Sequence, residues 1–423
     1  MNRGVYTLAL RAASPLVWLW MAHRARRAGG QWQIFSAERF GRGAMPPASF
    51  AAPVWVHAVS LGETRAAQPL LQALLDRGLP VLLTHITATG RAEGERLFAD
   101  AIARGQLRQA WLPYDFPGAT RRFLARWRPR CGLLIEREIW PNLLAAAGAQ
   151  RVPMGLVSAR YSESSLRQTR RMGAVMRETL AGLDLVLAQT PQDAERLRQA
   201  GAPQAVVTGS LKFDLTLPPA RVDAGRQWRA ALGRPVVAVA STREGEDAGF
   251  IDAIKRVSAL PGAPLFLLIP RHPQRFDEAA GLLDEAGLPF VRRSRDVSPG
   301  PDTAVLLGDS LGEMAFYYAA CDVAIVAGSF APLGGQNLIE ACAAAVPVIV
   351  GPHTFNFQQA AIEAIEAGGV LRAADAGQAV QVALELLKDD ARRQSMGRAG
   401  RAWFETHAGA VARTMGALSP WLA

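Results

Sequence analysis

The sequence has few cysteines and no recognisable signature for a metal or for nucleic acid. Its three cysteines, Cys131, Cys321 and Cys342, lie far apart in apolar or alanine-rich runs. They predict neither a disulfide framework nor a metal cluster and fit a reducing compartment. No His-Glu-x-x-His, Cys-x-x-Cys, Asp-x-Asp or Walker-type stretch occurs, so we expect no metal site and no cofactor. Zinc-finger, RNA-recognition and basic-zipper patterns are missing too, which argues against a nucleic-acid partner.

Acidic residues are in the minority, and the basic excess is confined to the first half of the chain. The 423 residues carry a formal net charge of +10, and 50% of them are hydrophobic. This is enough for two globular domains of about 200 residues each. Residues 1–212 contain 28 Lys and Arg against 14 Asp and Glu, whereas residues 213–423 contain 19 against 23. We expect the first half to meet an anionic partner, and anionic lipid, a phosphorylated acceptor and nucleic acid all qualify on charge alone.

The sequence also lacks a long apolar run free of charge. Its most hydrophobic segment, residues 5–22, contains Arg11 and Pro15 and is followed by a basic cluster at 23–27. A cleavable signal peptide carries its charges before the apolar core instead. Trp18 and Trp20 favour the membrane–water boundary, and the arginines favour anionic headgroups. We interpret residues 1–30 as an anchor on the cytoplasmic side of the inner membrane, which either crosses the bilayer or lies on it. A first helix packed on the core is the alternative.

Apolar, strand-like runs alternate with helix-period segments along both halves. They lie near 54–59, 80–86, 108–112, 132–136, 153–157, 184–188 and 205–208, and again near 236–240, 264–269, 303–307, 323–327 and 347–350. Strands separated by helices of about 10–15 residues imply βαβ crossovers and parallel sheets. We predict an α/β fold of two Rossmann-like domains whose parallel sheets face each other across a cleft, the glycosyltransferase-B architecture, plus the N-terminal membrane-associating helix.

The same rhythm sets the domain boundaries. We expect the two domains at 31–208 and 234–401, with an interdomain linker at 209–233. By analogy with this architecture, a C-terminal helix within 402–423 crosses back to the first domain.

Charged side chains follow several strands of the first half. Glu63 stands where a strand, a tight turn and a helix meet, and ligands of open parallel sheets bind at such carboxyl ends. The alternative is that Glu63 merely complements the helix dipole. Glu136 and Glu138 straddle the end of the strand-like run near 132–136, with a surface ion pair as the alternative. Lys212 lies at the domain boundary, where its ammonium stabilises a departing phosphate or a bound carboxylate, or faces water as part of a hinge.

Polar loops follow the strands of the second half. An arginine offers a planar fork to phosphate, and a glycine-rich turn before a helix presents backbone N–H groups to an anion. An ordinary strand-to-helix turn is the alternative at each position. The candidates for binding a nucleotide are Pro270, Arg271, Leu311, Gly312, Glu313, Asn337, Leu338, Ile339 and Glu340.

Several of these stretches, in consistent order from about residue 5 to 420, resemble the 3-deoxy-D-manno-octulosonic acid (Kdo) transferases of lipopolysaccharide biosynthesis. Residues 209–214 are identical to the family's Gly-Ser-Leu-Lys-Phe-Asp, and residues 351–357 repeat its Gly-Pro-His-Thr-Phe-Asn-Phe. Residues 60–64, Ser-Leu-Gly-Glu-Thr, resemble its Ser-Val-Gly-Glu-Thr. The chain departs from the family at Arg137 for threonine, Gln336 for histidine and Leu338 for proline, and the last two put the phosphate geometry in doubt.

The resemblance implies an inverting, metal-independent glycosyltransferase that moves Kdo from CMP-Kdo to the lipid A precursor lipid IVA. It makes Glu63 the general base and places Glu136 in the transition-state neighbourhood. Residues 31–208 would bind the acceptor and residues 234–401 would bind CMP-Kdo, with Pro270 and Arg271 on the nucleotide and residues 311–313 on the cytidine.

Two alternatives stay open at this point. One is a glycosyltransferase-B enzyme that uses a different nucleotide sugar. The other is a non-catalytic adaptor that binds anionic lipid, which the basic first half and the anchor suggest but which leaves the loops of the second half without a role.

Overall fold

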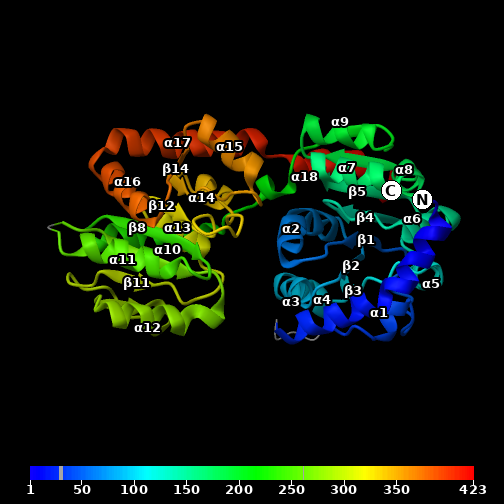
Figure 1. Cartoon of the computed structure of the whole chain (residues 1–423), viewed down its shortest axis with the longest axis horizontal. Coiled ribbons are helices and arrows are strands. Elements are labelled where there is room, and N and C mark those ends of the chain that lie inside the picture. The colour runs from blue at the N-terminus through cyan, green and yellow to red at the C-terminus, as the bar shows by residue number, and fades with distance from the viewer. Residues whose placement is uncertain (28–31, 261) are drawn as a thin grey trace. The chain divides into compact units, whose positions relative to one another are not determined.

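The computed structural model describes residues 1–27, 32–260 and 262–423, so the predicted junction at 30 and 31 lies outside the described residues. The chain divides into two compact units (Figure 1). The first comprises Met1–Leu215 together with Ala408–Ala423, and the second comprises Thr216–His407.

The first unit is built on a parallel sheet of 7 strands in the order β3-β2-β1-β4-β5-β6-β7. Val54 of β1 pairs with Val81 of β2 on one side and with Cys131 of β4 on the other. The strands are β1 (Val54–His57), β2 (Val81–His85), β3 (Leu107–Trp111), β4 (Cys131–Ile135), β5 (Met154–Ala159), β6 (Leu185–Ala188) and β7 (Ala205–Val207). Its helices are α1 (Arg3–Arg27), η1 (Ala37–Phe40), α2 (Leu61–Asp76), α3 (Ala88–Leu97), α4 (Ala99–Ala103), α5 (Pro117–Trp127), α6 (Pro141–Ala149), α7 (Glu163–Met172), α8 (Ala174–Ala181), α9 (Pro191–Gln199), η2 (Leu211–Asp214) and α18 (Ala410–Leu422).

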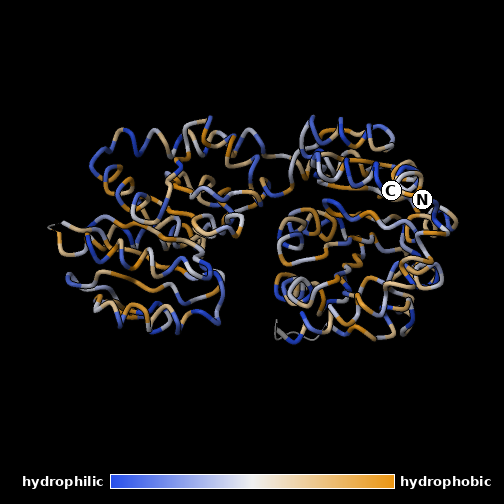
Figure 2. The backbone as a smooth tube through the Cα atoms, viewed as in Figure 1, coloured by the Kyte–Doolittle hydropathy of each residue, from blue (hydrophilic) through white to orange (hydrophobic). Residues whose placement is uncertain are grey.

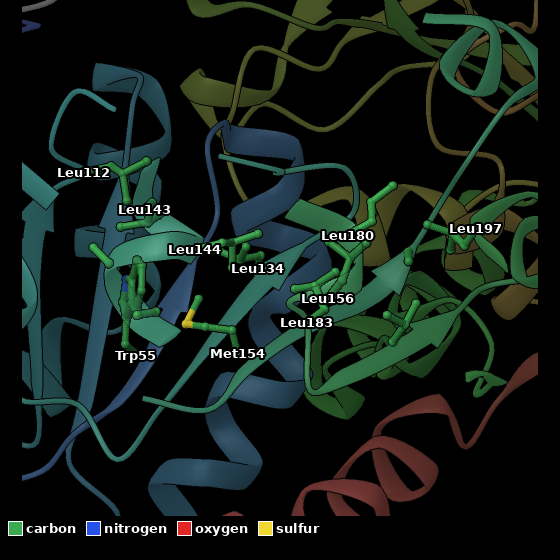
Figure 3. Packing of buried hydrophobic residues seen from close by; sticks show 14 of the residues in the cluster. Trp55, Leu112, Leu134, Leu143, Leu144, Met154, Leu156, Leu180, Leu183 and Leu197 are labelled. Atoms are coloured by element: carbon green, nitrogen blue, oxygen red, sulfur yellow. The ribbon is translucent and has the colours of Figure 1, made fainter. Parts of the chain in front are cut away.

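Both faces of this sheet are covered, which is why its strands are mostly apolar and mostly buried. Along β1, Trp55 joins one hydrophobic cluster, while Val54 and Val56 join another, because successive side chains point to opposite faces. Figure 3 shows the cluster of Trp55, in which side chains of β4, β5, α6 and α8 pack together. The indole of Trp55 also stacks edge-on against Phe123 of α5, with ring centroids 5.1 Å apart.

The second unit repeats the architecture with a parallel sheet in the order β10-β11-β9-β8-β12-β13-β14. Figure 2 shows its helices alternating between hydrophobic and hydrophilic stretches, as expected for helices that pack on a sheet with one side. The strands are β8 (Val236–Thr242), β9 (Leu265–Pro270), β10 (Phe290–Arg292), β11 (Val305–Leu307), β12 (Val323–Val326), β13 (Val348–Val350) and β14 (Val370–Arg372). The helices are α10 (Pro219–Leu232), α11 (Asp247–Ser258), η3 (Pro273–Arg275), α12 (Phe276–Ala286), η4 (Arg293–Arg295), α13 (Met314–Ala319), α14 (Ile339–Ala343), α15 (Gln358–Glu366), α16 (Ala376–Lys388) and α17 (Asp390–His407).

Two parallel-sheet α/β domains were predicted, and the structure confirms them. The sequence did not reveal β10 and β14, the two edge strands of the second sheet. Each has three residues, and neither is fully buried. Both end in arginine, with Phe-Val-Arg in β10 and Val-Leu-Arg in β14, so neither has an apolar run as long as those that identified the other strands.

The boundary between the two units, between Leu215 and Thr216, falls inside the linker expected at 209–233. Most of that stretch is helical, with η2 belonging to the first unit and α10 to the second. The C-terminal stretch 402–423 is likewise two helices, because α17 ends at His407 and α18 begins at Ala410. Gly409 between them has a φ of 87°, a left-handed conformation that favours glycine. Helix α18 packs on α2 and η2, where the carboxylate of Asp214 accepts the backbone N–H groups of Gly409 and Val411.

Helix α1 lies against the first unit along a single stripe of residues. Its more buried positions are Tyr6, Thr7, Leu10, Ser14, Trp18, Met21, Ala22 and Ala25. Near one end the hydroxyl of Tyr6 donates to Asp115 Oδ2 at 2.9 Å. Further along, the indole of Trp18 stacks against Phe35, Phe40, Tyr114 and Phe116. The rest of the helix is exposed, so it is not the core-packed first helix considered as the alternative.

Candidate active site

The strand order of the first unit reverses between β1 and β4. From β1 the chain moves outward through β2 and β3, and from β4 it moves the other way through β5, β6 and β7. In open α/β sheets, ligands bind outside the carboxyl ends of the strands at such a switch point. Glu63 follows β1 and Glu136 follows β4, so the sheet delivers both carboxylates to this edge.

Glu63 occupies the first turn of α2. The helix begins after Ser60, whose Oγ accepts the N–H of Glu63 at 3.5 Å. In return, Oε2 of Glu63 accepts the backbone N–H of Val59 at 2.6 Å. This reciprocal arrangement resembles a capping box, which Ser and Glu three residues apart predict. The Ser60 N-cap and the hydrogen bond from Val59 together hold the carboxylate at the carboxyl end of β1.

The pKa of Glu63 is raised to about 8. Burial is the main cause, because a charged carboxylate loses its hydration, and the negative charges of Glu138 and Glu136 add to the effect. The hydrogen bond from Val59 and the charge of Lys212 act in the opposite direction and are weaker. A carboxylate that titrates near neutral pH is suited to accept a proton, and such groups cluster at functional sites.

Glu136 and Lys212 form an ion pair, with 2.7 Å between Lys212 Nζ and Glu136 Oε1. Glu136 has a φ of 62°, a left-handed conformation that is uncommon for a residue with a side chain. Lys212 is delivered by η2, which Ser210 caps by accepting the N–H of Lys212. The structure thus brings together all three residues predicted as catalytic, Glu63, Glu136 and Lys212.

The second unit has an equivalent switch point between β8 and β12. Glu246, in the turn after β8, is buried and accepts the N–H groups of Arg243 at 2.8 Å and of Gly328, after β12, at 2.7 Å. It also accepts those of Phe330 at 2.9 Å and Ala331 at 3.2 Å. One carboxylate therefore holds together the two loops that flank the switch point.

The glycine-rich loop that follows β12 lies near Arg271, which follows β9. The Nε of Arg271 donates to Oε1 of Gln336 at 3.2 Å. Gly334 and Gly335 have φ values of 92° and 81°, and a Cβ at Gly334 would collide with Asn356. Pro270 is the last residue of β9 and is buried. The structure thus places Arg271 beside the very residue that departs from the family pattern.

The remaining candidates lie at two other places in this unit. Asn337 uses both ends of its amide, donating to Glu340 Oε1 at 3.0 Å and accepting the N–H of Ile339 at 3.1 Å, with Leu338 buried between them. After β11, Leu311 is 67% exposed and Gly312 has a φ of 78°. The carboxylate of Glu313 is paired with Arg293 at 3.1 Å and Arg221 at 3.0 Å, so this side chain is already engaged.

Comparison with known proteins identifies the family. A model described as 3-deoxy-D-manno-octulosonic-acid transferase (kdotransferase) matches residues 36–215. The chain is 70% identical to the 3-deoxy-D-manno-octulosonic acid transferase of Bordetella pertussis, with 100% of both chains covered. The chain belongs to the Kdo transferase family. Its relative in Haemophilus influenzae, with the same description, is 32% identical over 100% of this chain and 99% of the relative.

The fold agrees with this membership. The UDP-GlcNAc 2-epimerase of Neisseria meningitidis, solved with UDP-GlcNAc, matches with a TM-score of 0.58 at 15% identity, over 87% of this chain and 100% of that one. At such an identity the likeness concerns the fold alone. It confirms the glycosyltransferase-B class that the strand rhythm predicted for this Kdo transferase.

Sequence reasoning missed three residues of these two sites in the Kdo transferase. Glu138 was noticed as the second carboxylate of its pair but given no role, although it contributes to the raised pKa of Glu63. His57, directly before the Ser60 turn, is completely buried with its ring facing Glu138. Glu246 joins the loops of the second unit. The sequence offered two signals. His57 is a histidine at the end of an apolar strand, and Glu246 is an acidic residue in a glycine-containing turn.

Among the residues that the structure describes, no group of three or more His, Cys, Asp and Glu side chains is arranged to hold a metal ion. The expectation that the reaction needs neither metal nor cofactor stays a prediction.

Proposed function

We propose that this Kdo transferase moves Kdo from CMP-Kdo to a hydroxyl of lipid IVA, with inversion at the anomeric carbon and with Glu63 as general base. The observation that carries the proposal is a carboxylate at a switch point with its pKa raised to about 8. A base is most effective when its pKa lies near the operating pH. The identity of the transferred sugar rests on membership of the family.

In the proposed reaction, Glu63 takes the proton of the acceptor hydroxyl while that oxygen attacks the anomeric carbon of Kdo. The bond from the anomeric carbon to the phosphate oxygen breaks, and CMP leaves with its electron pair. Because Oε2 of Glu63 accepts the N–H of Val59, we assign the proton to Oε1. The hydrogen bond at Oε2 fixes the orientation of the carboxylate, so Oε1 stays aimed in one direction.

Lys212 and Glu136 are proposed to act as a unit in the transition state. The ammonium of Lys212 offers a compact positive charge to the carboxylate of Kdo or to the departing phosphate. Its 2.7 Å ion pair with Glu136 holds it in position before the substrates bind. No resident metal or cofactor is required by this scheme.

Donor binding is assigned to the second unit. Arg271 is proposed to contact the phosphate of CMP, with Gln336 orienting its guanidinium through the 3.2 Å hydrogen bond. The backbone of Leu311 and Gly312 is proposed to read the cytidine, because the side chain of Glu313 is engaged by two arginines. Asn337 and Glu340, joined by their 3.0 Å hydrogen bond, are proposed to meet the ribose hydroxyls.

The acceptor is a lipid, and α1 is proposed to hold the enzyme to the cytoplasmic face of the inner membrane. Residues 3–26 are long and apolar enough to cross a bilayer by length and composition, and only 6% of their most apolar window is buried. The packed stripe from Tyr6 to Met21, however, runs along about 22 Å of the helix. A helix held lengthwise against a domain cannot be surrounded by lipid, so we propose that α1 lies in the membrane surface.

The exposed side of α1 fits that position. Leu8, Leu16, Leu19 and Trp20 are 56–72% exposed and provide the apolar contact. Arg24 lies over the ring of Trp20, with 5.3 Å from its Cζ to the ring centroid, which suits the headgroup level. Vesicles containing anionic lipid should therefore bind the protein, and Leu16→Asp combined with Leu19→Asp should abolish binding. Retained binding by that variant would contradict the assignment.

Mass spectrometry of lipid IVA incubated with the enzyme and CMP-Kdo tests the function directly. We expect a mass increase of one or more Kdo units with the wild-type protein and none with Glu63→Ala. A protein that is stabilised thermally by UDP but not by CMP would instead indicate a different nucleotide sugar. Binding of anionic vesicles without binding of any nucleotide would indicate a lipid adaptor.

A further inference from the structure

His57 is a completely buried histidine at the end of β1, two residues before the Val59 N–H that holds Glu63. Its Nδ1 lies 2.9 Å from Thr84 Oγ1 and 3.1 Å from Thr84 O. The same hydroxyl oxygen accepts the indole N–H of Trp55 at 2.9 Å. The imidazole is therefore fixed from the β2 side by a polar contact inside the sheet.

The other ring nitrogen faces the active site. His57 Nε2 is buried and has no hydrogen-bond partner within 3.5 Å in the described part of the chain, and the carboxylate oxygen Oε2 of Glu138 lies 3.7 Å away. A bare nitrogen lone pair facing a carboxylate would be repelled, so the proton belongs on Nε2. In that tautomer Thr84 Oγ1 donates to Nδ1 and accepts the N–H of Trp55. Thr84 O then makes no hydrogen bond to the ring and keeps the backbone N–H of Ala58, at 3.0 Å, as its donor.

Glu138 itself is held from two directions. The indole N–H of Trp140 donates to its Oε2 at 3.0 Å, and His57 faces the same oxygen. The contacts with Trp140 and His57 therefore fix where the negative charge of Glu138 lies relative to Glu63.

The charged and titratable groups around Glu63 come from four elements. Glu136 and Glu138 lie on the segment between β4 and α6, and Lys212 lies on η2, paired with Glu136. Below them are His57 on β1 and His85 on β2. His85 contacts Ala58 O through Nδ1 at 2.9 Å, and burial lowers its pKa to about 3, which keeps it neutral. Glu136 has Lys212 as its counter-charge, whereas the position of Glu138 depends on its contacts with Trp140 and His57.

We propose that His57 is a positioning residue of the reaction, which holds Glu138 beside Glu63 and thereby sets the pH range in which Glu63 accepts the acceptor's proton. This inference rests on the proposed role of Glu63 as general base. It gives a role in the reaction to a histidine and a carboxylate that do not themselves contact the reacting atoms.

Glu138→Gln tests the electrostatic half of the proposal. Removing one negative charge near Glu63 should make that residue easier to ionise, so the acid limb of the kcat–pH profile should move down by about one pH unit. The KM values for both substrates should stay within about twofold of wild type. An acid limb that does not move would overturn the proposal.

His57→Asn and His57→Gln form a matched pair for the positional half. Asparagine reproduces Nδ1 and keeps the contact with Thr84 but is too short to reach Glu138, whereas glutamine extends an N–H to about the position of Nε2. His57→Asn should therefore move the acid limb down by about half a pH unit, and His57→Gln should leave it near wild type. Equal limbs for the two variants would contradict the proposal.

Combining His57→Asn with Glu138→Gln separates positioning from a general structural role. If His57 acts through Glu138, the double variant should have the same acid limb as Glu138→Gln alone. Glu138→Gln has already removed the charge through which His57 acts. An independent further shift would mean that His57 acts by another route. Should His57→Asn fail to fold, as judged by thermal unfolding, Glu138→Gln alone still decides the electrostatic half.

The titration of Glu63 can also be followed without turnover. Carbon-13 NMR of glutamate side-chain carboxyls, with Glu63→Gln to assign the signal, should show Glu63 titrating at lower pH in His57→Asn than in wild type. An inactive wild-type enzyme would count against the proposed function, whereas an active enzyme with an unchanged Glu63 titration in His57→Asn would count against this inference alone.

Discussion

The two units place a glutamate at the same point of the same fold and treat it in opposite ways. Glu63 follows β1 of the first unit, and Glu246 follows β8 of the second, each beside the switch point of its sheet. Among the described residues, Glu63 accepts a backbone N–H from Val59 alone, whereas Glu246 accepts four such groups, from Arg243, Gly328, Phe330 and Ala331.

The difference teaches how the donors around one position of a fold either stabilise or disfavour the charge of a glutamate. Four N–H groups saturate the oxygens of Glu246, so its charge is stabilised and its function is to hold two loops together. Glu63 is partly buried beside two further carboxylates, so its charge is disfavoured and its pKa is raised to about 8. The geometry of the sheet is common to both, and the surrounding donors decide the chemistry.

The largest effect should come from Glu63→Gln, which keeps the shape of the side chain and removes its basicity. We expect kcat to fall by about 10²–10⁴-fold, the usual contribution of a general base. The fold should be intact, since the amide still accepts the N–H of Val59. Steady-state transfer of Kdo to lipid IVA measures the loss, with Glu178→Gln on the exposed side of α8 as the control.

The same substitution in the second unit, Glu246→Gln, should affect stability first. In the wild type these backbone N–H groups donate to the carboxylate. The amide N–H₂ of glutamine is itself a donor and would face some of them, which leaves buried donors without an acceptor. We expect the free energy of unfolding of the second unit to fall by about 2–3 kcal/mol. Urea unfolding followed by the indole of Trp228 reports it, with exposed Glu285→Gln on α12 as the control. A stable Glu246→Gln that lost only base catalysis would remove the contrast between the units.

The fold was predictable because central parallel strands are buried on both faces and therefore read as continuous apolar runs. Strands β10 and β14 were not predictable in this way, since each has only three residues and ends in arginine. Helix α10 was taken for linker although its ends carry ordinary signals, Pro219 in its first turn and Gly233 at its C-cap with a φ of 72°. The expectation of a domain boundary at 209–233 outweighed these local signals.

Of the site, the residues at strand ends were predictable and their partners were not. Glu63, Glu136 and Lys212 could be identified because each stands in a family motif. Glu246 could not, since its partners at 328–331 are backbone N–H groups about 80 residues further along, which carry no side-chain signature. His57 escaped for a related reason: a lone buried histidine is identified as a functional residue only when the carboxylate that faces it is known.

The pH dependence of turnover is expected to be steep on the acid side. With the pKa of Glu63 raised to about 8, the ionised base should be lost about tenfold for each pH unit below that value. The sign for stability is opposite. Because the folded-state pKa exceeds the unfolded one, the stabilisation from protonated Glu63 is complete below about pH 4.5 and is lost as pH rises through about 8.

Kinetics between pH 6 and pH 9 and chemical unfolding over the same range check both signs. Wild type should lose stability relative to Glu63→Gln as the pH rises, while its activity increases. Glu246→Gln should keep the acid limb of wild type, because Glu246 is engaged by backbone N–H groups of its own unit. If the acid limb of Glu246→Gln were shifted, Glu246 would influence the ionisation of Glu63. The comparison between the two glutamates would then fail.

The smallest effect is expected at Gln336, where the chain departs from the histidine of its family. Gln336→His replaces an amide that accepts the Nε–H of Arg271 by an imidazole that is also able to accept it. We expect the KM for CMP-Kdo to change by no more than about threefold, roughly half of one hydrogen bond's net free energy, with an unchanged acid limb. Arg271→Lys is the matched comparison, because it removes the planar fork and should raise that KM more. If Gln336→His moved the acid limb, the second unit would take part in setting the basicity of Glu63, and the division between a reactive and a structural carboxylate would fail.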